Sequence, residues 1–392
     1  MIFDQKPLRE ITEADLRAEI AAGLAEHLFL DYKLENYGQR DADRKEFLLD
    51  ICQFANAEGG FLLLGVPEVR EEGRPTGVPD PDGQLGIEIE NPENALLRYD
   101  ALIAANIHER LRVESCSIPI QGGRVVLAFR VPNSTAKPHC VKLQGEHVYF
   151  PIRRERHRVY LDIREVKEMA MRTASQLERA RSVLEASLPN EPRPGTNVCF
   201  HIGLVPVFFR EFLVDVKLPR VREAFAAFHV RTGLANLSQP TFSYEGLVRA
   251  TQNRDWVTLC RIGLIKSTSI ITAREHEGRL YCFPVSADLL LRNFVVRAQT
   301  FTQVAEIVGP YLLKVALHSP SGVVALGAGL AGGEEEIGQL GAGYWPSPEM
   351  QLDTISDPFS QIIRPFCDFL HQMFGCEESP NFDADGNWVG RA

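Results

Sequence analysis

The sequence predicts a mixed α/β protein built from two domains. In the first half of the chain, short apolar runs of strand type alternate with helical patterns. A proline-rich stretch at 189–195 then interrupts the pattern, and the second half has apolar runs and helical segments of its own. The length of 392 residues fits this division, since one domain takes about 100–200 residues.

The composition excludes a disordered chain and a membrane-embedded one. Hydrophobic residues make up 45% of the chain, which is too high for disorder. The longest unbroken apolar stretch, 203–209, is too short to span a bilayer, and residues 1–16 have no apolar core of signal-peptide length. We therefore expect a soluble, cytoplasmic chain with no membrane partner. Its eight cysteines, none of them in a CxxC pair, are expected to be reduced.

The first expected elements are a helix over 10–27 and a strand over 28–33. Thr12 can cap the helix, and apolar residues recur along it at helical spacing. These residues are Leu16, Ile20 and Leu24. Gly23 interrupts the pattern, so the helix can end early.

A second helix is expected from Asp41 or Asp43 through Glu58, where Gly59-Gly60 stops it. The next run, FLLLGV at 61–66, is almost fully apolar, which is typical of a strand buried on both faces. Two strands joined by a helix resemble a βαβ unit, so both strands should lie in one sheet.

The rest of the first domain contains further helices and strands. After a proline- and glycine-rich stretch at 67–86, we expect a helix near 94–111, strands at 115–120 and 124–131, a strand at 147–152 and a charged helix at 163–188. The first domain then covers 1–189, and residues 190–196 form the linker.

The C-terminal domain, 197–392, is expected to be α/β or α+β, with its topology left open. Apolar runs occur at 201–209 and 323–330, and helices are expected at 242–250 and 353–375.

Three acids and a lysine are the first candidate site. Side chains on a strand repeat every two residues, so Asp31 and Lys33 share a face. Glu26 lies just before that strand, and Glu68 follows the strand at 61–66. Carboxylates suit Mg²⁺ or Mn²⁺, which can activate water and neutralise a phosphate, and a lysine would help to hold the phosphate. The alternative is a set of solvated surface acids with one salt bridge.

Two segments, LFLDYK at 28–33 and CQFANAEGGFLLLGV at 52–66, resemble the AlbA-like domain of the Schlafen family. Ser134, Pro138-His139, Tyr149 and Arg153 follow in the family's order, so the resemblance covers about 12–170. It implies an α/β domain and, in the members that are nucleases, three metal-binding acids.

Carried over to this sequence, the resemblance implies that Glu26, Asp31 and Glu68 bind Mg²⁺ or Mn²⁺ and that Lys33 contacts the scissile phosphate. The implied activity is a metal-dependent endoribonuclease that cleaves tRNA or other structured RNA, in a bacterial antiviral-defence or stress setting. The C-terminal domain would then be regulatory and sense a protein or ligand trigger. The oligomeric state, including a homo-oligomer, stays open.

Two departures from the family pattern favour an alternative function. Asp31 stands where Glu is usual and is one methylene shorter, and Glu155-Arg156 replaces a Gly-Ser turn that could cradle a phosphate. The alternative is a non-catalytic regulator that binds DNA, RNA or a nucleotide.

The segment 137–158 is locally basic, with six Lys or Arg against two acids, in a chain of net charge −10. Alternating cations on a strand can follow a phosphate backbone, and an aromatic ring can stack on a base. We therefore expect nucleic-acid contacts, with RNA favoured over DNA, from Lys137, His139, Tyr149, Arg153, Arg154, Arg156 and Arg158. The alternative is an ordinary solvated hairpin.

Two weaker signals lie in the same region. Asn56, in the FANAEGG segment, either caps the helix or is functional, and the cap is favoured. Cys116 with His139-Cys140 could begin a zinc site, but the spacing fits no tight pattern.

Overall fold

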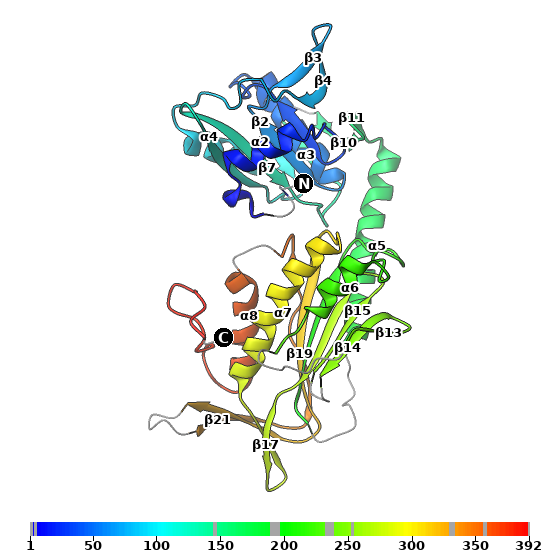
Figure 1. Ribbon diagram of the computed structural model, residues 1–392, viewed down its shortest axis with the longest axis vertical. Helices are drawn as coiled ribbons and strands as arrows, with labels where there is room; N and C mark the ends of the chain where they lie inside the picture. The colour runs from blue at the N-terminus through cyan, green and yellow to red at the C-terminus, as the bar shows by residue number, and fades with distance from the viewer. Residues whose placement is uncertain are drawn as a thin grey trace. The chain divides into compact units, whose positions relative to one another are not determined.

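The chain divides into two compact units, which we call the N-terminal unit (Met1–Leu177) and the C-terminal unit (Glu178–Ala392) (Figure 1). The computed structural model describes residues 3, 6–143, 147–188, 197–231, 239–251, 255–328, 334–355 and 359–390. Helices and strands are both abundant in this part of the chain, which confirms the mixed α/β class. None of the helices described combines the length and the hydropathy needed to cross a membrane.

The central sheet of the N-terminal unit has the strand order β1-β2-β7-β6. β1 (Leu30–Lys33) and β2 (Gly60–Leu64) are parallel and are joined by α3 (Asp41–Asn56), so the predicted βαβ unit is confirmed. β7 (Arg124–Val131) pairs antiparallel with β2 and with β6 (Glu114–Ile120).

Both faces of this sheet are covered, as the apolar run in β2 predicts. One face packs against α3 and α4 (Pro92–Asn106), and the other packs against α2 (Glu13–Ala21) and a short 3-10 helix, η1 (Leu8–Glu10). Leu62 and Leu64 lie in the first core, whereas Phe61 and Leu63 lie in the second.

Local sequence signals explain where the N-terminal helices end. α2 begins with a capping box between Thr12 and Asp15, and it ends before Gly23, whose φ is +68°. α4 ends at Asn106 rather than at 111, because the chain continues directly into β5 (Ile107–His108), which pairs with β8 (Cys140–Lys142).

The proline- and glycine-rich stretch at 67–86 contains a hairpin of β3 (Glu68–Glu71) and β4 (Arg74–Pro79), which projects from the unit in Figure 1. One expectation for this unit is wrong. The single strand expected at 147–152 is two strands, because β9 (Val148–Tyr149) pairs with β8 whereas β10 (Pro151–Arg154) pairs with β11 (His157–Tyr160). Pro151 has no backbone N–H with which to extend the β8 ladder.

The charged helix is confirmed as α5 (Ile163–Ser187), and the division between the units falls inside it. Its last turn belongs to the C-terminal unit, because Leu184 and Leu188 are buried there over Gly203 of β12 (Cys199–Pro206). The predicted linker at 190–196 lies outside the described residues, so the domain boundary at 189 stays a prediction.

The C-terminal unit is built on one large sheet, with helices α6 (Pro219–Ala226), α7 (Pro284–Val304) and α8 (Phe359–Met373) packed into its core. The strands described run in the order β13-β14-β15-β16-β12-β19-β22, and β23 also pairs with β19. Their bounds are β13 (Thr241–Phe242), β14 (Gly246–Thr251), β15 (Asp255–Cys260), β16 (Ile265–Ile270), β19 (Tyr311–Ser319), β22 (Gly343–Pro346) and β23 (Met350–Leu352). A second sheet has the order β17-β18-β20-β21, with β17 (Thr272–His276), β18 (Arg279–Cys282), β20 (Val323–Ala328) and β21 (Glu334–Leu340).

The apolar runs that begin at 201 and 323 contribute to β12 and β20, and the helix expected at 353–375 is confirmed as α8. The helix expected at 242–250 is wrong, because this segment forms β13, a turn and β14. Tertiary contacts override the local spacing here. A Cβ on Gly246 would lie 2.1 Å from the carbonyl oxygen of Leu259, so close pairing with β15 requires glycine at this position.

Candidate functional site

Glu26 is held between β1 and the β3–β4 hairpin. Its backbone N–H donates to the carbonyl of Gly77 in β4 at 2.7 Å, and its Oε1 accepts the backbone N–H of Tyr32 in β1 at 2.8 Å. The side chain is 14% exposed. Two strands that are distant in the sequence therefore fix one acid.

Glu68 joins the same place through Gly77. The backbone N–H of Gly77 donates to Oε2 of Glu68 at 2.9 Å, so one residue of β4 contacts both glutamates. Gly77 has a φ of +74°, and a Cβ there would lie 3.1 Å from Oε2 of Glu26 and 1.6 Å from the Arg156 guanidinium. Only glycine allows this approach without strain.

Asp31 is the buried centre of the site. Its side chain is 5% exposed, with Lys33 Nζ 2.5 Å from Oδ2 and Arg153 Nη2 3.1 Å from Oδ1. Burial raises the pKa of Asp31, but Lys33 and Arg153 outweigh it, so the pKa lies below its ordinary value. Asp31 is therefore ionised at neutral pH.

Glu26 is the acid of this group whose charged form is disfavoured by its surroundings. Burial, then the charge of Asp31, and to a smaller extent that of Glu68, raise the pKa of Glu26 to about 7. The interaction between the two side chains raises the pKa of Glu26 and lowers that of Asp31, so Glu26 is the member of the pair that takes up a proton first. Glu26, Asp31 and Glu68, which we call the acid cluster, are thus brought together by the fold.

Lys33 lies between the acid cluster and a second acid that the sequence patterns do not single out. Burial lowers the pKa of Lys33, but Asp31 and then Asp50 raise it, and the net shift is upward. Lys33 therefore stays charged at neutral pH.

Asp50 is that second acid, and it lies on the buried side of α3. Its carboxylate accepts hydrogen bonds from Tyr37 Oη at 2.6 Å, Gln53 Nε2 at 2.9 Å and Arg158 Nη1 at 3.1 Å. Burial raises the pKa of Asp50 to about 6. The one sequence signal for it is a single acid inside the apolar run FLLDICQF at 47–54.

The segment predicted to be a basic groove does not present its first two members to a ligand. His139 is completely buried, with Nε2 2.7 Å from Ser134 Oγ and Nδ1 2.9 Å from the carbonyl of Glu109. Lys137 Nζ donates to the carbonyl of Ala57, at the end of α3. Both side chains are used to join segments of the unit, and their predicted contacts with nucleic acid stay predictions.

Two of the arginines support acids of the site. Arg153 is 3% exposed, stacks on Phe54 with 5.0 Å to the ring centroid, and holds Asp31. Arg158 pairs with Glu46 at 2.7 Å and with Asp50 at 3.1 Å. The predicted nucleic-acid contact does not fit the buried Arg153, whose guanidinium faces the acid cluster.

Three residues of the segment remain accessible. The side chains of Arg154 and Arg156, on the β10–β11 hairpin, are 58% and 44% exposed. Arg154 pairs with Glu165, while Arg156 donates to the carbonyl of Thr76 at 2.5 Å and lies 4.0 Å from Oε2 of Glu26. Tyr149 is partly buried under Lys45 Nζ, which lies 3.9 Å from the ring centroid.

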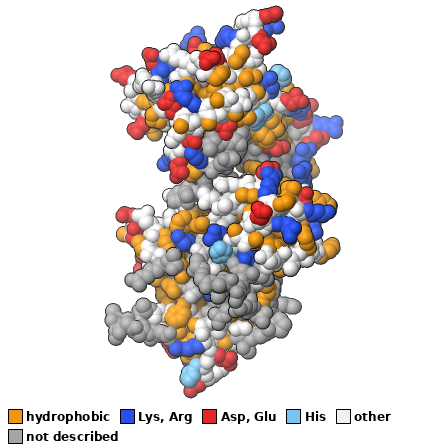
Figure 2. All heavy atoms as spheres, in the orientation of Figure 1, with side chains coloured by type: hydrophobic (Ala, Val, Ile, Leu, Met, Phe, Trp, Pro, Cys, Tyr) orange, Lys and Arg blue, Asp and Glu red, His pale blue; other side chains and the backbone are white. Residues whose placement is uncertain are grey.

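On the face drawn in Figure 2, acidic and basic side chains of the N-terminal unit are interspersed.

Asn56 is not a helix cap. Its Nδ2 donates to the carbonyls of His139 and Pro151 at 2.8 Å each, and its Oδ1 accepts the backbone N–H of His139 at 2.7 Å. The side chain therefore ties α3 to two later segments, a role that no local pattern predicts.

Within the described residues, no group of three or more His, Cys, Asp or Glu side chains is arranged to hold a metal ion. In the acid cluster, Lys33 and Arg153 already contact both oxygens of Asp31. A cation could bind here only if Lys33 withdrew and Glu26 lost its proton.

Residues 26–165 match the family model described as Schlafen, AlbA_2, which confirms the resemblance. All of the candidate residues described above lie within this range. No curated protein matches the chain significantly.

Solved structures are also similar to the chain. One is the N-terminal domain of an ATP-dependent DNA helicase RecG-related protein from Nitrosomonas europaea, with 25% identity over 35% of this chain and 84% of that one, at a TM-score of 0.26. Another is the DIP2311 protein from Corynebacterium diphtheriae, with 16% identity over 62% of this chain and 40% of that one, also at a TM-score of 0.26.

Proposed function

We propose that the Schlafen AlbA_2 domain of this chain binds nucleic acid and is a metal-dependent endoribonuclease. The acid cluster carries this proposal. Three carboxylates from β1, the segment before it and the β3–β4 hairpin lie close together, and burial, then the charges of Asp31 and Glu68, raise the pKa of Glu26 to about 7. Acids with perturbed pKa values in close proximity cluster at functional sites.

The donor chemistry of the acid cluster suits Mg²⁺ or Mn²⁺. Such a cation would be held by Glu26, Asp31 and Glu68, and it would take the place of the proton on Glu26 and of Lys33 on Asp31. When bound, it would supply an activated water and neutralise charge on a phosphate. Lys33, once released from Asp31, is the cation nearest to that phosphate.

The exposed arginines of the β10–β11 hairpin would orient the substrate. Arg156 lies next to Glu26, and Arg154 is on the same hairpin. An RNA backbone bound by both arginines would therefore pass the acid cluster. The preference for RNA, including tRNA, and a role in bacterial defence or stress rest on the family resemblance. A protein or ligand trigger acting on the C-terminal unit and a homo-oligomer belong to the same proposal.

One observation favours a second function, non-catalytic binding of nucleic acid or nucleotide by a regulator. Four cations face the acids of the site, namely Lys33, Arg153, Arg156 and Arg158. Their ion-pair partners are Asp31, Glu26, Asp50 and Glu46. A site neutralised by its own side chains needs no metal to be stable.

The decisive experiment separates binding from cleavage. The purified chain is incubated with total RNA, purified tRNA, single-stranded DNA and double-stranded DNA, each with Mn²⁺, Mg²⁺ or EDTA. Cleavage of RNA that EDTA abolishes supports the nuclease. Tight RNA binding without cleavage under any condition supports the regulator, and absence of both contradicts the proposal.

Metal binding is measured independently by calorimetric titration with Mn²⁺. The matched pair of variants is Glu68→Gln in the acid cluster and Glu71→Gln, which is exposed further along the same hairpin. The proposal expects Glu68→Gln alone to weaken Mn²⁺ binding.

A further inference from the structure

Lys33, the lysine of the candidate site, faces a helix that carries an acid of its own. Lys33 lies beside Leu64 in the parallel pairing of β1 with β2, and Leu64 belongs to the core that α3 covers. Asp31, two residues earlier on β1, faces the same way. Asp50 is the buried acid of α3, with a side chain that is 6% exposed. Asp31, Lys33 and Asp50 therefore lie on one side of the sheet.

The β10–β11 hairpin holds Asp31 and Asp50 close together. Arg153 and Arg158 are directly opposite each other in its register, so their side chains share a face. Arg153 binds Asp31 at 3.1 Å. Arg158 binds Asp50, also at 3.1 Å. Arg153 stacks in addition on Phe54, which lies one helical turn after Asp50 on α3.

Arg158 alone does not balance the charge of Asp50. Its guanidinium also binds Glu46, at 2.7 Å, and the other two donors to Asp50 are an uncharged phenol and an uncharged amide. Burial raises the pKa of Asp50, and the charge of Lys33 is the largest of the effects that oppose this rise. Burial lowers the pKa of Lys33, and Asp50 is second only to Asp31 among the charges that raise it. Lys33 is thus shared by two acids.

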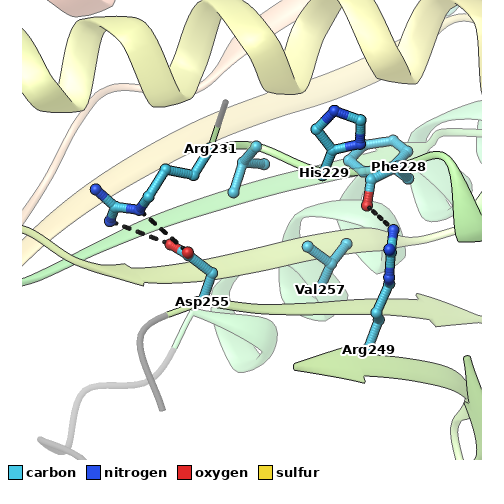
Figure 3. A pocket seen from close by; sticks show the side chains of 7 residues that line it. Phe228, His229, Arg231, Arg249, Asp255 and Val257 are labelled. Carbon is cyan, nitrogen blue, oxygen red and sulfur yellow. Dashed lines mark hydrogen bonds and ion pairs between the residues drawn. The ribbon is translucent and has the colours of Figure 1, made fainter. Parts of the chain in front are cut away.

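A buried ion pair of the C-terminal unit has a different arrangement (Figure 3). The Asp255 side chain is 3% exposed, and Arg231 donates to both of its oxygens through two nitrogens, at 3.1 and 3.2 Å. One bidentate guanidinium matches one carboxylate there. Asp50 accepts from Nη1 of Arg158, whose Nη2 donates to Glu46. Asp50 therefore keeps attraction for a second cation.

We propose that Asp50 is a positioning residue that keeps Lys33 in the site when a divalent cation occupies Asp31. This inference rests on the proposed function, in which the cation takes the place of Lys33 on Asp31. The ammonium then lies against Asp50, and its side chain, which is 35% exposed in this structure, has access to a phosphate at the surface. Without the second acid, a displaced lysine would turn to solvent or compete with the cation for Asp31.

The test follows the Lys33 side chain itself, by NMR of the full chain with isotope-labelled lysine. An ammonium group that is held by an acid exchanges its protons with water more slowly than a free one. Lys33→Met identifies the Lys33 signal by its loss. Asp31→Asn removes the charge that Lys33 contacts, so it imitates occupation of Asp31 without a metal ion. The Lys33 signal should shift in Asp31→Asn and stay protected from exchange, and Mg²⁺ should shift it in the same direction in the wild type.

Removing Asp50 as well should release the lysine. In the double variant Asp31→Asn with Asp50→Asn, proton exchange of the Lys33 ammonium should be at least about tenfold faster than in Asp31→Asn, since a hydrogen bond to a charged group is lost. The matched control combines Asp31→Asn with Glu46→Gln, because Glu46 lies one turn from Asp50 on α3 and also binds Arg158. This control should exchange as Asp31→Asn does.

The inference is overturned if the Lys33 ammonium loses its protection in folded Asp31→Asn, a result that needs no variant of Asp50. It is also overturned if the double variant with Asp50→Asn exchanges as Asp31→Asn does, or if Glu46→Gln has the same effect as Asp50→Asn. Failure of the proposed function gives a different result, in which Mg²⁺ leaves the Lys33 signal of the wild type unshifted although Asp31→Asn shifts it. That result contradicts the displacement of Lys33 by a cation, and with it both proposals.

Discussion

Each unit buries an acid, but the two acids have opposite surroundings. Asp288 of the C-terminal unit is fully buried and meets hydrogen-bond donors: His371 Nε2 at 3.0 Å, Ser379 Oγ at 2.7 Å and Asn381 Nδ2 at 3.0 Å. Glu26 of the N-terminal unit meets the carboxylates of Asp31 and Glu68. A buried acid among donors stabilises a fold, whereas a buried acid among acids keeps a place for a proton or a metal ion.

The largest expected effect comes from replacing Glu26, the buried acid whose pKa is raised. We expect Glu26→Gln to lower RNA cleavage at least about 10³-fold, or about 4 kcal/mol in the activation barrier, because a metal ligand is removed. RNA affinity should stay the same or rise, since negative charge leaves the site. The measurement is single-turnover cleavage of labelled RNA with Mn²⁺, alongside a filter-binding assay.

Glu71→Gln is the matched control, since Glu71 is an exposed acid of the same hairpin. Asp31→Asn is less clean, because it leaves Lys33 and Arg153 without their anion. If Glu26→Gln cuts RNA as the wild type does, the metal site has been assigned wrongly.

Removing Asp288, the acid that lies among hydrogen-bond donors, should act on stability instead. Asp288→Ala leaves three buried groups without their acceptor, so we expect a loss of about 3 kcal/mol in the free energy of unfolding of the C-terminal unit. Trp256, Trp345 and Trp388 are the only tryptophans of the chain, and all three belong to this unit. Urea unfolding followed by tryptophan fluorescence therefore reports on this unit alone.

The N-terminal unit should be unaffected by Asp288→Ala, so RNA binding at low urea is the control. An unchanged unfolding midpoint would mean that the buried acid contributes no net stability. Asp288 would then have to be examined for a role beyond packing.

The pH dependence of stability sharpens the contrast further. The pKa of Glu26 rises from its ordinary 4.5 to about 7 on folding, so the native state holds more protons than the unfolded state between these values. The contribution of Glu26 to the stability of the N-terminal unit is fully present below pH 4.5. It is lost as the pH rises to about 7. Because Glu26 is partly solvated, we expect a change of about 1–2 kcal/mol.

Glu26→Gln imitates the protonated side chain, so it should abolish this loss and exceed the wild type in stability at pH 8. The measurement is thermal unfolding by circular dichroism at pH 5 and pH 8. The fluorescence transition of the C-terminal unit serves as an internal control. If the stability of the wild type and that of Glu26→Gln depend on pH in the same way, the pKa of Glu26 is not raised on folding.

The same contrast explains what the sequence can predict. The β1–α3–β2 unit follows from local apolar patterns, and the positions of Glu26, Asp31 and Glu68 follow from the family resemblance together with strand geometry. The strands at 242–250 do not follow from such patterns, because the close approach of Gly246 to β15 leaves no trace in local spacing.

The roles of the cations around the site are hidden from the sequence for a related reason. Arg153 reaches back to the carbonyl of His27, and Arg158 reaches back to Asp50 and Glu46. Such pairs join residues more than a hundred positions apart, and charge patterns along the chain do not specify them. The basic segment 137–158 therefore has the composition of a nucleic-acid-binding groove. In the fold, much of it instead pairs with acids of the same unit.

The smallest expected effect concerns the cations that remain exposed. Replacing Arg154 and Arg156 together with Gln should weaken RNA binding and lower the slope of log affinity against log salt by about 1 for each phosphate that the variant no longer neutralises. The cleavage rate at saturating RNA should change little, because Glu26, Asp31 and Glu68 are intact. The measurement is RNA affinity at a series of salt concentrations, with Arg70→Gln, an exposed arginine of the β3–β4 hairpin, as the control. If the double variant keeps the wild-type slope, the RNA backbone runs elsewhere. If it cuts RNA faster, Arg156 restrains Glu26 rather than guiding the substrate, because its guanidinium lies 4.0 Å from that carboxyl group.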